Sequence, residues 1–427
     1  MTTSLRTGEN FDFNELFSSR TMALSERVAL VSAIVGQHEA NETSPYHRVI
    51  DSPMGRSVKL MSSKGHALDI LMFGSNNYLG FANHPHLAAK INEAVARWGS
   101  GHSGPPHLNG YTSIARDLEA RLAEFKGKED AMLFSSGFSA NLAVAASLAQ
   151  PRDVFFYDEN SHASMFDGIR LSGARSRRFP HNDVNALADL LERHQPDETR
   201  DVYVTVEGVY SMEGDIAPLD EITALVKKHK AILLLDDAHG TGVMGTSGHG
   251  TGHHFGVSED IEFIVGTFSK TFAVTGGFVA ASREQINYLR YAARSYMFSA
   301  GLPPASVAAV HAGLDLLQSE PQHLQKLRSN IAYAQERFNA LPYSFSLDLQ
   351  SPIISLKAVP TMNVRMETRR LQELGVFVNP VEFPAVSQED ERFRISLSAS
   401  HSSEDIDHLV AAVDNIWSTH LGRGSVG

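Results

Sequence analysis

The 427-residue sequence contains no cysteine. Disulfides, thiolate metal sites and cysteine nucleophiles are therefore excluded, and the absence is compatible with the reducing conditions of the cytoplasm. Long apolar runs are missing as well, because no stretch reaches the ~18 uncharged apolar residues that a membrane-spanning helix needs. The N-terminus also lacks the apolar run of a secretory signal. We therefore expect a cytoplasmic protein with no integral membrane segment.

An excess of positive charge is absent too. The 37 lysine and arginine residues are outnumbered by 49 aspartate and glutamate residues, which gives a net charge of −12. This balance argues against nucleic acid as a partner, since binding to phosphates needs a positive surface. It leaves room for an anionic small substrate, because a local pocket can oppose the global sign. The length favours one large and one smaller domain.

Short apolar runs alternate with helical patterns through the middle of the chain. Most of the runs are continuously apolar or β-branched, as strands buried on both faces of a sheet should be. Helical patterns such as residues 184–192 and 219–230 separate several of them. This alternation predicts an α/β fold with a mostly parallel sheet covered by helices. The predicted strands are residues 131–134, 154–157, 176–179, 202–206, 232–235, 263–265 and 278–280.

The same patterns divide the chain into three parts. Residues 1–66 form an N-terminal arm with a helical start and a polar, mixed continuation, and residues 67–315 form the large domain. Residues 316–427 form a smaller α+β domain with strand-like runs at 353–357 and 393–397 and a final helix. The apolar positions that give this helix its spacing are Ile406, Leu409, Val413 and Ile416.

Polar clusters follow five of the predicted strands directly. In an open α/β sheet, ligands bind at the edge formed by the carboxyl ends of the strands. Five clusters at one edge therefore predict a ligand site more strongly than any single motif does. The clusters are Ser135-Ser136-Gly137, Ser161-His162, Glu207 with Ser211, Asp236 with His239, and Thr267-Phe268-Ser269-Lys270.

Lys270 is the first candidate at this edge. It follows a buried strand, the hydroxyls of Thr267 and Ser269 precede it, and Gly276-Gly277 allow a close backbone approach. Most lysines are surface residues without such surroundings. A lysine desolvated here would have a lowered pKa and could form an imine, while the hydroxyls could bind a phosphate. The sequence therefore predicts pyridoxal phosphate (PLP) bound at Lys270.

Three further candidates fit this cofactor. Asp236 ends an apolar strand, and its carboxylate suits a protonated pyridine nitrogen, whereas Asp237 has a simpler interpretation as a helix cap. Residues 136–138 precede a helical run whose first N–H groups would hold a phosphate, although capping alone would explain the serine. His162 is placed to stack on a ring or to move a proton, but a lone histidine is more often structural.

Two other motifs do not change this interpretation. Residues 240–245 satisfy G-x-G-x-x-G, but the glycines do not follow the strand directly and no helix opens on them, so we reject a dinucleotide site. His249, His253 and His254 form a second histidine group without an acidic residue at ligand spacing, so we predict no metal.

Five runs of the sequence carry a family resemblance: Ser75-Asn76-Asn77-Tyr78-Leu79-Gly80, Ser161-His162-Ala163-Ser164, Glu207-Gly208-Val209-Tyr210-Ser211-Met212-Glu213-Gly214-Asp215, Asp236-Asp237-Ala238-His239-Gly240 and Gly266-Thr267-Phe268-Ser269-Lys270. They resemble the α-oxoamine synthases, which include serine palmitoyltransferase, 8-amino-7-oxononanoate synthase, 5-aminolevulinate synthase and 2-amino-3-ketobutyrate CoA ligase. The resemblance extends in order from about residue 70 over nearly the whole chain. It implies fold type I of the PLP enzymes and a homodimer with active sites at the subunit interface.

The resemblance also implies a role for individual residues. Lys270 would hold PLP as a Schiff base and, once free, remove the Cα proton, while Asp236 would keep the ring nitrogen protonated. His162 would stack on the ring. Asn76 and Arg394 would bind the substrate carboxylate, although Arg392 is a close competitor because alternation along a strand places both arginines on one face. The remaining cofactor contacts would be Ser136, Gly137, Phe138, Glu207, Ser211, His239, Thr267 and Ser269.

The reaction implied by the resemblance is a decarboxylating condensation. An α-amino acid reacts with an acyl thioester, delivered by CoA or by an acyl-carrier protein, to give an α-amino ketone, CO₂ and the free thiol. A serine palmitoyltransferase-like enzyme, or a secondary-metabolite or signalling relative, is the leading interpretation. The alternatives are 8-amino-7-oxononanoate synthase activity, 2-amino-3-ketobutyrate CoA ligase activity, and a lyase or aminotransferase reaction on the same fold. A non-catalytic subunit is disfavoured by the joint presence of Lys270, Asp236 and His162.

The chain departs from the family pattern in two places. Gly104-Pro105-Pro106 stands where the family usually has Gly-Ser-Arg or Gly-Thr-Arg, and Ala273 stands where a glycine is usual. Neither departure touches the chemistry expected at Lys270. Both leave the identity of the acyl donor open.

Overall fold

The computed structural model describes residues 22–40, 44, 46–62, 65–197, 199–343, 345–383 and 385–421. Residues 1–21 of the predicted arm and residues 422–427 of the predicted small domain lie outside these ranges. None of the described helices is long and apolar enough to cross a membrane.

A seven-stranded sheet forms the centre of the molecule, with the order β4-β10-β9-β8-β7-β5-β6. All seven predicted strands are present, and the α/β fold is confirmed. The sheet is parallel except for β10, which pairs antiparallel with both of its neighbours. The strands are β4 (Asp130–Phe134), β5 (Val154–Asp158), β6 (Arg175–Phe179), β7 (Val202–Glu207), β8 (Ile232–Asp236), β9 (Phe263–Thr267) and β10 (Gly277–Ala281).

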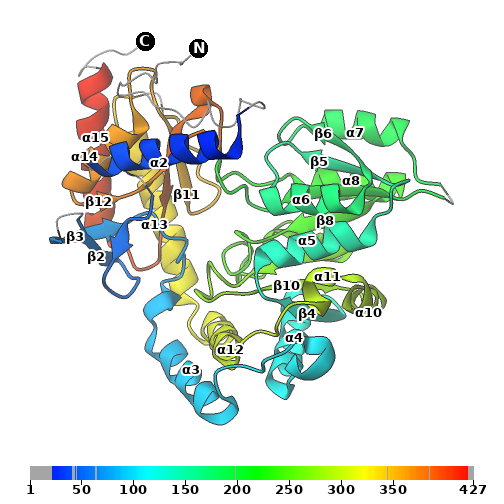
Figure 1. Cartoon of the computed structure of the whole chain (residues 1–427). Helices are drawn as coiled ribbons and strands as arrows, with labels where there is room; N and C mark the ends of the chain where they lie inside the picture. Colours follow the sequence, from blue (N-terminus) through cyan, green and yellow to red (C-terminus); the bar gives the residue numbers. More distant parts are fainter. Residues whose placement is uncertain are drawn as a thin grey trace.

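Helices cover both faces of this sheet (Figure 1). On one face, α5 (Gly137–Leu148), α6 (Ala163–Ser172) and α10 (Arg283–Ala292) bury their apolar sides against β4, β9 and β10. On the other face, α7 (Val184–Arg193) and α8 (Leu219–His229) pack on β5, β7 and β8. Because the central strands are covered twice, every residue of β7, β9 and β10 is buried, which explains their continuously apolar sequences.

Two smaller sheets lie in the N- and C-terminal parts of the chain. The sheet β11-β14-β13 combines β11 (Ile353–Lys357), β14 (Arg392–Ser396) and β13 (Asn379–Val381). The sheet β1-β2-β3-β12 combines β1 (Val49–Ile50), β2 (Ser57–Met61), β3 (Ala67–Met72) and β12 (Val376–Phe377). Since β3 pairs with β12, residues 67–72 lie beside the C-terminal part of the chain. The division at residues 66 and 315 stays a prediction.

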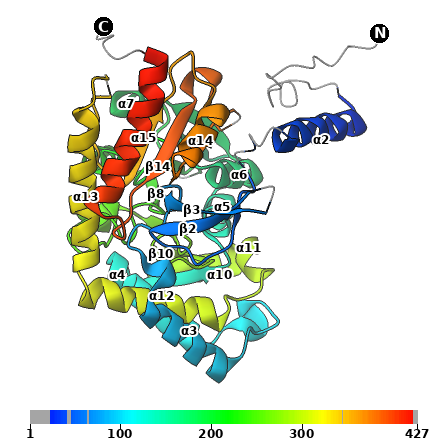
Figure 2. The same ribbon diagram turned by 90° about the vertical axis from the view of Figure 1, so that its left-hand side faces the viewer.

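The C-terminal helix α15 (Ser403–Leu421) follows the predicted spacing, and all four of its predicted apolar positions are buried. Long helices connect the sheets (Figures 1 and 2). The remaining helices are α2 (Leu24–Ala40), α3 (Pro85–Trp98), α4 (Ser113–Lys126), α9 (Thr251–His254), α11 (Arg294–Met297), α12 (Pro304–Ser319), α13 (Gln322–Asn339) and α14 (Val364–Glu373), with short turns η1 (Phe81–Asn83), η2 (Pro106–Gly110), η3 (Ser258–Asp260) and η4 (Gln388–Asp390).

Ala273 adopts the left-handed conformation, with φ of 54°, in a turn closed by its N–H and the carbonyl of Lys270. This conformation destabilises an L-residue by about 1–2 kcal/mol. Glycine avoids that strain, but it loses more chain entropy on folding than alanine does, which costs roughly 0.5–1 kcal/mol. We therefore expect Ala273→Gly to stabilise the protein by about 0.5–1 kcal/mol, measured as a shift of the denaturation midpoint. The matched change Ala332→Gly, at an exposed position inside α13, should destabilise by about 1 kcal/mol. A destabilised Ala273→Gly variant would contradict the strain argument.

Candidate active site

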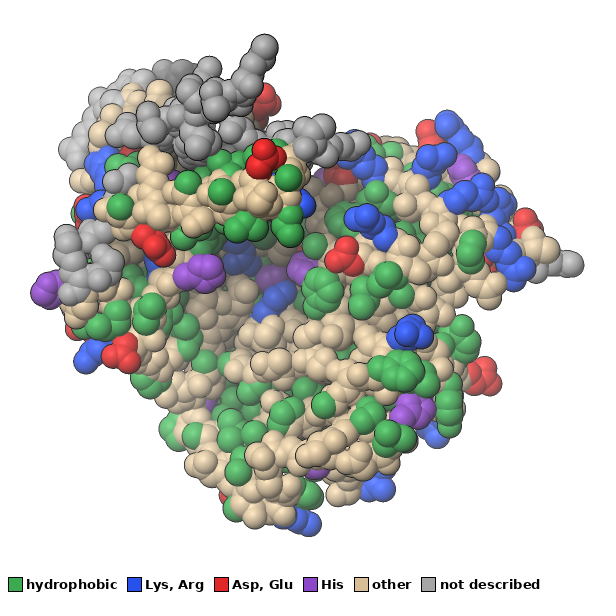
Figure 3. Space-filling view, in the orientation of Figure 1, with side chains coloured by type: hydrophobic (Ala, Val, Ile, Leu, Met, Phe, Trp, Pro, Cys, Tyr) green, Lys and Arg blue, Asp and Glu red, His purple; other side chains and the backbone are tan. Residues whose placement is uncertain are grey.

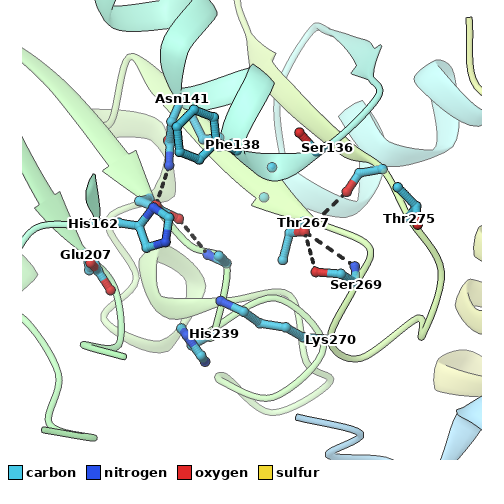
Figure 4. Close-up of a pocket in the computed structure, with 16 residues that line it drawn as sticks. Ser136, Phe138, Asn141, His162, Glu207, His239, Thr267, Ser269, Lys270 and Thr275 are labelled. Atoms are coloured by element: carbon cyan, nitrogen blue, oxygen red, sulfur yellow. Dashed lines mark hydrogen bonds between the residues drawn. The ribbon is translucent and has the colours of Figure 1, made fainter. Parts of the chain in front are cut away.

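The predicted polar clusters converge on one cavity of about 240 Å³ at the carboxyl ends of the central strands. It lies in the hollow at the centre of the face shown in Figure 3, and Figure 4 shows its lining. Ten of the predicted residues line it, namely Ser136, Gly137, Phe138, His162, Glu207, Asp236, His239, Thr267, Ser269 and Lys270. Six further lining residues were not among the predicted site residues, namely Asn141, Ala238, Val265, Gly266, Thr275 and Gly276.

Lys270 extends from the loop after β9 into this cavity (Figure 4). Burial disfavours the charged ammonium and lowers its pKa to about 8, although the carboxylates of Asp236 and Glu207 oppose the shift. The guanidinium of Arg394 lowers the pKa further by repulsion. At pH 7 about a tenth of the amine is therefore neutral and nucleophilic, far more than for an ordinary lysine.

Asp236 also lines the cavity, and a hydrogen-bonded chain of side chains holds its carboxylate in place. Its Oδ1 accepts a bond from the N–H of Ala238 at 3.0 Å, and its Oδ2 accepts one from the amide of Asn141 at 2.6 Å. The Asn141 amide also donates to the Ser164 hydroxyl at 2.9 Å, and that hydroxyl lies 2.6 Å from Nδ1 of His162. This chain fixes the carboxylate and the imidazole relative to each other. Asn141 lies one helical turn after Gly137, which is the only sequence signal that could have found it.

The other end of the cavity has the properties of a phosphate site. The first N–H groups of α5, at Gly137 and Phe138, have no acceptor within the helix because Ser136 is its N-cap. A Cβ atom on Gly137 would lie 2.8 Å from Cβ of Thr267, so only glycine allows this approach. The Thr267 hydroxyl lies 2.9 Å from that of Ser269, and both face the cavity (Figure 4). Helix N–H groups and hydroxyls together suit an anion.

Two buried polar groups complete the wall. Oε1 of Glu207 is buried without a hydrogen-bond partner, whereas its Oε2 accepts a bond from the N–H of Ser211 at 3.2 Å. Burial and the neighbouring Asp236 raise the pKa of Glu207 well above its ordinary value. Burial lowers the pKa of His239 far below its ordinary value, with further lowering by Lys270. His239 is therefore a neutral imidazole, and its Nδ1 is hydrogen-bonded to the Tyr78 hydroxyl at 2.7 Å.

A second cluster lies beyond the residues that line the cavity. It contains the three remaining predicted site residues. Arg394 donates to the carbonyl of Ser211 and, at 3.0 Å, to the side-chain oxygen of Asn76. Arg394 is 6% exposed. Arg392, the competitor on the same strand, is instead paired with Glu213 at 3.1 Å. The two arginines thus have different surroundings, since the positive charge of Arg394 lowers the pKa values of Lys270 and His239, whereas Arg392 is paired with Glu213.

The weaker motifs have structural explanations. In residues 240–245, Gly242 and Gly245 have φ of 83° and 75° and form turns, and α9 begins only at Thr251. Asp237 is not the N-cap of a helix as predicted, because Gly250 holds that position in α9, but its carboxylate accepts a bond from the N–H of Thr251 at 3.1 Å. It also forms an ion pair with Lys126 at 2.7 Å, with both side chains 1% exposed. The sequence analysis did not identify this pair.

The loop that departs from the family pattern packs away from the cavity. Residues 106–110 form a π-type turn, and His107 bonds the carbonyl of Arg290. The Asn109 amide donates to the carbonyl of His102 at 2.5 Å, and the N–H of Gly301 donates to the carbonyl of Gly104 at 3.1 Å. Within the described chain, this loop is therefore anchored to the segment around α11 and not to Lys270.

Comparison with known proteins agrees with these observations. The chain matches the aminotransferase class I and II family over residues 69–413. It is 39% identical over 366 residues to the serine palmitoyltransferase of Bacteriovorax stolpii, covering 86% of each chain. It is also 40% identical to the 8-amino-7-oxononanoate synthase of Trichlorobacter lovleyi, covering 83% of this chain and 89% of the relative.

Solved structures show the same relationship. The structure of Sphingomonas wittichii serine palmitoyltransferase superimposes with a TM-score of 0.87 at 32% identity, covering 93% of this chain and 99% of the relative. A second serine palmitoyltransferase, solved with PLP, gives the same TM-score at 30% identity. The family match, the identities and the motifs around Lys270 lead to one conclusion: this chain is an α-oxoamine synthase of the aminotransferase class I and II family.

Proposed function

We propose that the protein catalyses the PLP-dependent condensation of an α-amino acid with an acyl thioester, with loss of CO₂. The observation that carries the proposal is the position of Lys270, whose amine of lowered pKa extends into a cavity between a fixed carboxylate and an anion site. PLP fits these groups, because its phosphate, ring nitrogen and aldehyde each meet a residue of matching chemistry. When bound, PLP supplies an electron sink that stabilises a carbanion at Cα of the amino acid.

The residues of this chain have separate tasks in holding the reactants. The N–H groups of Gly137 and Phe138, with Thr267 and Ser269, would bind the phosphate. Asp236 would keep the ring nitrogen protonated, and the bond from Asn141 holds its carboxylate in place. His162 would cover one face of the ring. Lys270 would hold the cofactor covalently, and its amine, once free, would accept the Cα proton of the amino acid.

The bond changes follow from this arrangement. The electron pair left at Cα attacks the thioester carbonyl, a C–C bond forms, and the C–S bond breaks to release the thiol. The carboxylate then leaves as CO₂, and a proton returns to Cα to give the α-amino ketone. Arg394 pairs with the substrate carboxylate until that step, and its place beside Asn76 and near Lys270 supports this role.

Serine and a long-chain acyl-CoA are the substrates that we propose first. The support is the higher TM-score with serine palmitoyltransferases, 0.87, than with the 8-amino-7-oxononanoate synthase of Francisella tularensis, 0.71. Synthesis of 8-amino-7-oxononanoate is the second candidate, because relatives of that name reach equal identity over similar lengths.

The test is a matrix of amino acids against acyl-CoA and acyl-carrier-protein thioesters, scored by free thiol and by CO₂. We expect one amino acid to release both products in equal amounts with one class of thioester. Pyridoxamine formation without thiol release would indicate an aminotransferase and refute the proposal. Turnover with alanine and pimeloyl thioester, and none with serine, would establish the second candidate.

Removal of Arg394 should weaken amino-acid use specifically. Hydrogen bonds to charged groups contribute about 1.5–3 kcal/mol, so Arg394→Leu should lower kcat/KM for the amino acid by roughly 10- to 150-fold and leave KM for the thioester nearly unchanged. Arg392→Leu is the matched control, because the guanidinium of Arg392 forms an ion pair with Glu213. Equal losses in the two variants would contradict the assignment of the carboxylate to Arg394.

Covalent uptake of PLP by the apo-protein should depend on pH through Lys270. The neutral amine is the reactive form, and its pKa is about 8, so the uptake rate should rise as the pH increases through that value and level off above it. The carboxylate of Glu207 raises this pKa, so Glu207→Gln should move the midpoint to lower pH. Visible absorbance of the bound cofactor measures the rate. A midpoint that moves upward in Glu207→Gln would contradict the electrostatic argument.

We also propose that the enzyme is a homodimer of the cytoplasm, as its family resemblance and its sequence suggest. Exposed large apolar side chains support a subunit contact, since Phe138, which lines the cavity, is 45% exposed and Phe298 is 73% exposed. Sedimentation at equilibrium would show a monomer if this part of the proposal is wrong.

A further inference from the structure

Two histidines and a glutamate come together far from the cavity of Lys270, at a corner of the helical scaffold. His84 is the N-cap of α3, Glu320 ends α12, and His323 lies in the first turn of α13. Helix α3 packs along α12, and α13 leaves the corner toward the C-terminal part of the chain (Figures 1 and 2). The short connection between α12 and α13 therefore meets the start of α3, which is distant from it in sequence.

The donor atoms of these three residues already have the spacing of a coordination site. One donor atom from each of the three lies within 4.8 Å of the other two. Nε2 of His323 and Oε2 of Glu320 are 3.2 Å apart, and two ligands of a tetrahedral ion with bonds of about 2.0–2.1 Å lie roughly 3.3 Å apart. No large movement is needed to place a single ion between them.

The surroundings hold the two imidazole rings in position. All three residues are half-buried. The fully buried Phe81 packs edge-on against both rings, at centroid distances of 6.2 Å to His84 and 5.3 Å to His323. The two imidazoles are themselves edge-to-face at 5.8 Å. Packing therefore orders these side chains before any ligand binds.

We propose that His84, Glu320 and His323 bind a divalent transition-metal ion of the Zn²⁺ type, with water in the fourth position. Two imidazoles and one carboxylate form a ligand set that Zn²⁺ prefers, whereas Mg²⁺ and Ca²⁺ prefer oxygen ligands alone. No cysteine in the chain competes for the ion.

One hydrogen bond of the helix cap determines how His84 could coordinate an ion. Nδ1 of His84 accepts a bond from the N–H of His86 at 3.2 Å. Coordination through Nε2 therefore moves the ring proton to Nδ1 and exchanges one long cap hydrogen bond for a metal bond.

A bound ion would link the start of α3 to the corner between α12 and α13. Because α13 packs against α15 in the C-terminal part of the chain, the ion would stabilise the connection between the central sheet and the C-terminal helices. This role is structural and separate from the reaction at Lys270.

Calorimetric titration of the metal-stripped holoenzyme with Zn²⁺ in phosphate-free buffer tests the proposal. We expect one tight site per chain, and we expect His84→Ala, His323→Ala and Glu320→Gln each to weaken it by more than about tenfold. Co²⁺ in the same site should give the intense visible absorption of a four-coordinate ion. Zn²⁺ should raise the melting temperature of the wild type and not that of Glu320→Gln.

His254→Ala is the matched control, because His254 is an exposed histidine outside the cluster, and it should bind Zn²⁺ like the wild type. Turnover and the metal-free melting temperature check that each variant is folded, and Glu320→Gln preserves size if the histidine variants are unstable. The proposal is overturned if the wild type has no stoichiometric site. It is equally overturned if all three variants bind Zn²⁺ as the wild type does, or if only His254→Ala loses binding.

Discussion

Replacing Lys270 by alanine should lower kcat by about 10⁴-fold or more. A general base that takes a proton in the rate-determining chemistry contributes about 10²–10⁴-fold, and the same amine also attaches the cofactor covalently. Both contributions are lost in Lys270→Ala, whereas the phosphate site at the start of α5 remains. We therefore expect the variant to retain PLP with lower affinity and to be almost inactive.

Borohydride reduction followed by mass spectrometry separates these two effects. In the wild type, the pyridoxyl group should be found on the peptide that contains Lys270, and Lys270→Ala should carry none. Lys270→Arg preserves the positive charge but not the reactive amine, so it should be as inactive as the alanine variant. Lys128→Ala, outside the cavity lining, should keep the adduct and the activity. An adduct on another lysine of the wild type would remove the basis of the proposed mechanism.

The sequence was sufficient to predict the central sheet because most of its strands are buried on both faces, although the edge strand β6 is largely exposed. The buried strands are short and apolar, and five strands of the sheet are followed by polar clusters that the fold brings to one edge. Strands β2 and β3 were missed for the opposite reason. They are half-exposed, and β2 alternates exposed and buried residues over only five positions. β3 also pairs with β12, some 300 residues away, and no local pattern reports such a partner.

The residues of the candidate site likewise divide into those that the local sequence predicts and those that it does not. Lys270, Asp236 and His162 follow strand ends, and their positions could be predicted from the chain order alone. The choice between Arg392 and Arg394 could not, since both lie on one face of β14. This choice depends on Glu213, which comes from a different part of the chain and forms an ion pair with Arg392. The cluster of His84, Glu320 and His323 was likewise out of reach, because it forms only where three helices pack.

The buried pair of Lys126 and Asp237 gives the second large prediction. The three hydrogen-bond donors of the Lys126 ammonium are all used, by Asp237 at 2.7 Å, by the Thr241 hydroxyl at 2.8 Å and by the carbonyl of His249 at 2.7 Å. Lys126→Met should destabilise the protein by about 3–5 kcal/mol, because it leaves a buried carboxylate without its counter-charge. Chemical denaturation of the apo-protein measures the loss.

The double variant Lys126→Met/Asp237→Asn distinguishes charge from packing. If the unpaired charge causes the loss, removal of the carboxylate should restore at least about half of the stability that Lys126→Met costs, and Asp237→Asn alone should also be strongly destabilising. If Lys126 acts only by filling space, the double variant should be no more stable than Lys126→Met. Lys128→Met is the control on the same segment. Its ammonium is only partly buried and bonds one backbone carbonyl, so it should cost about 1 kcal/mol.

The position of this pair also connects stability with catalysis. Asp237 follows Asp236 directly, so an unpaired negative charge on Asp237 would repel the carboxylate of Asp236. The ionised carboxylate of Asp236 is the group that would keep the ring nitrogen of PLP protonated, and this repulsion would disturb its position. Lys126→Met should therefore lower PLP affinity as well as stability, and the double variant should recover both together. Recovery of stability without recovery of PLP affinity would show that Lys126 supports the fold but does not influence Asp236.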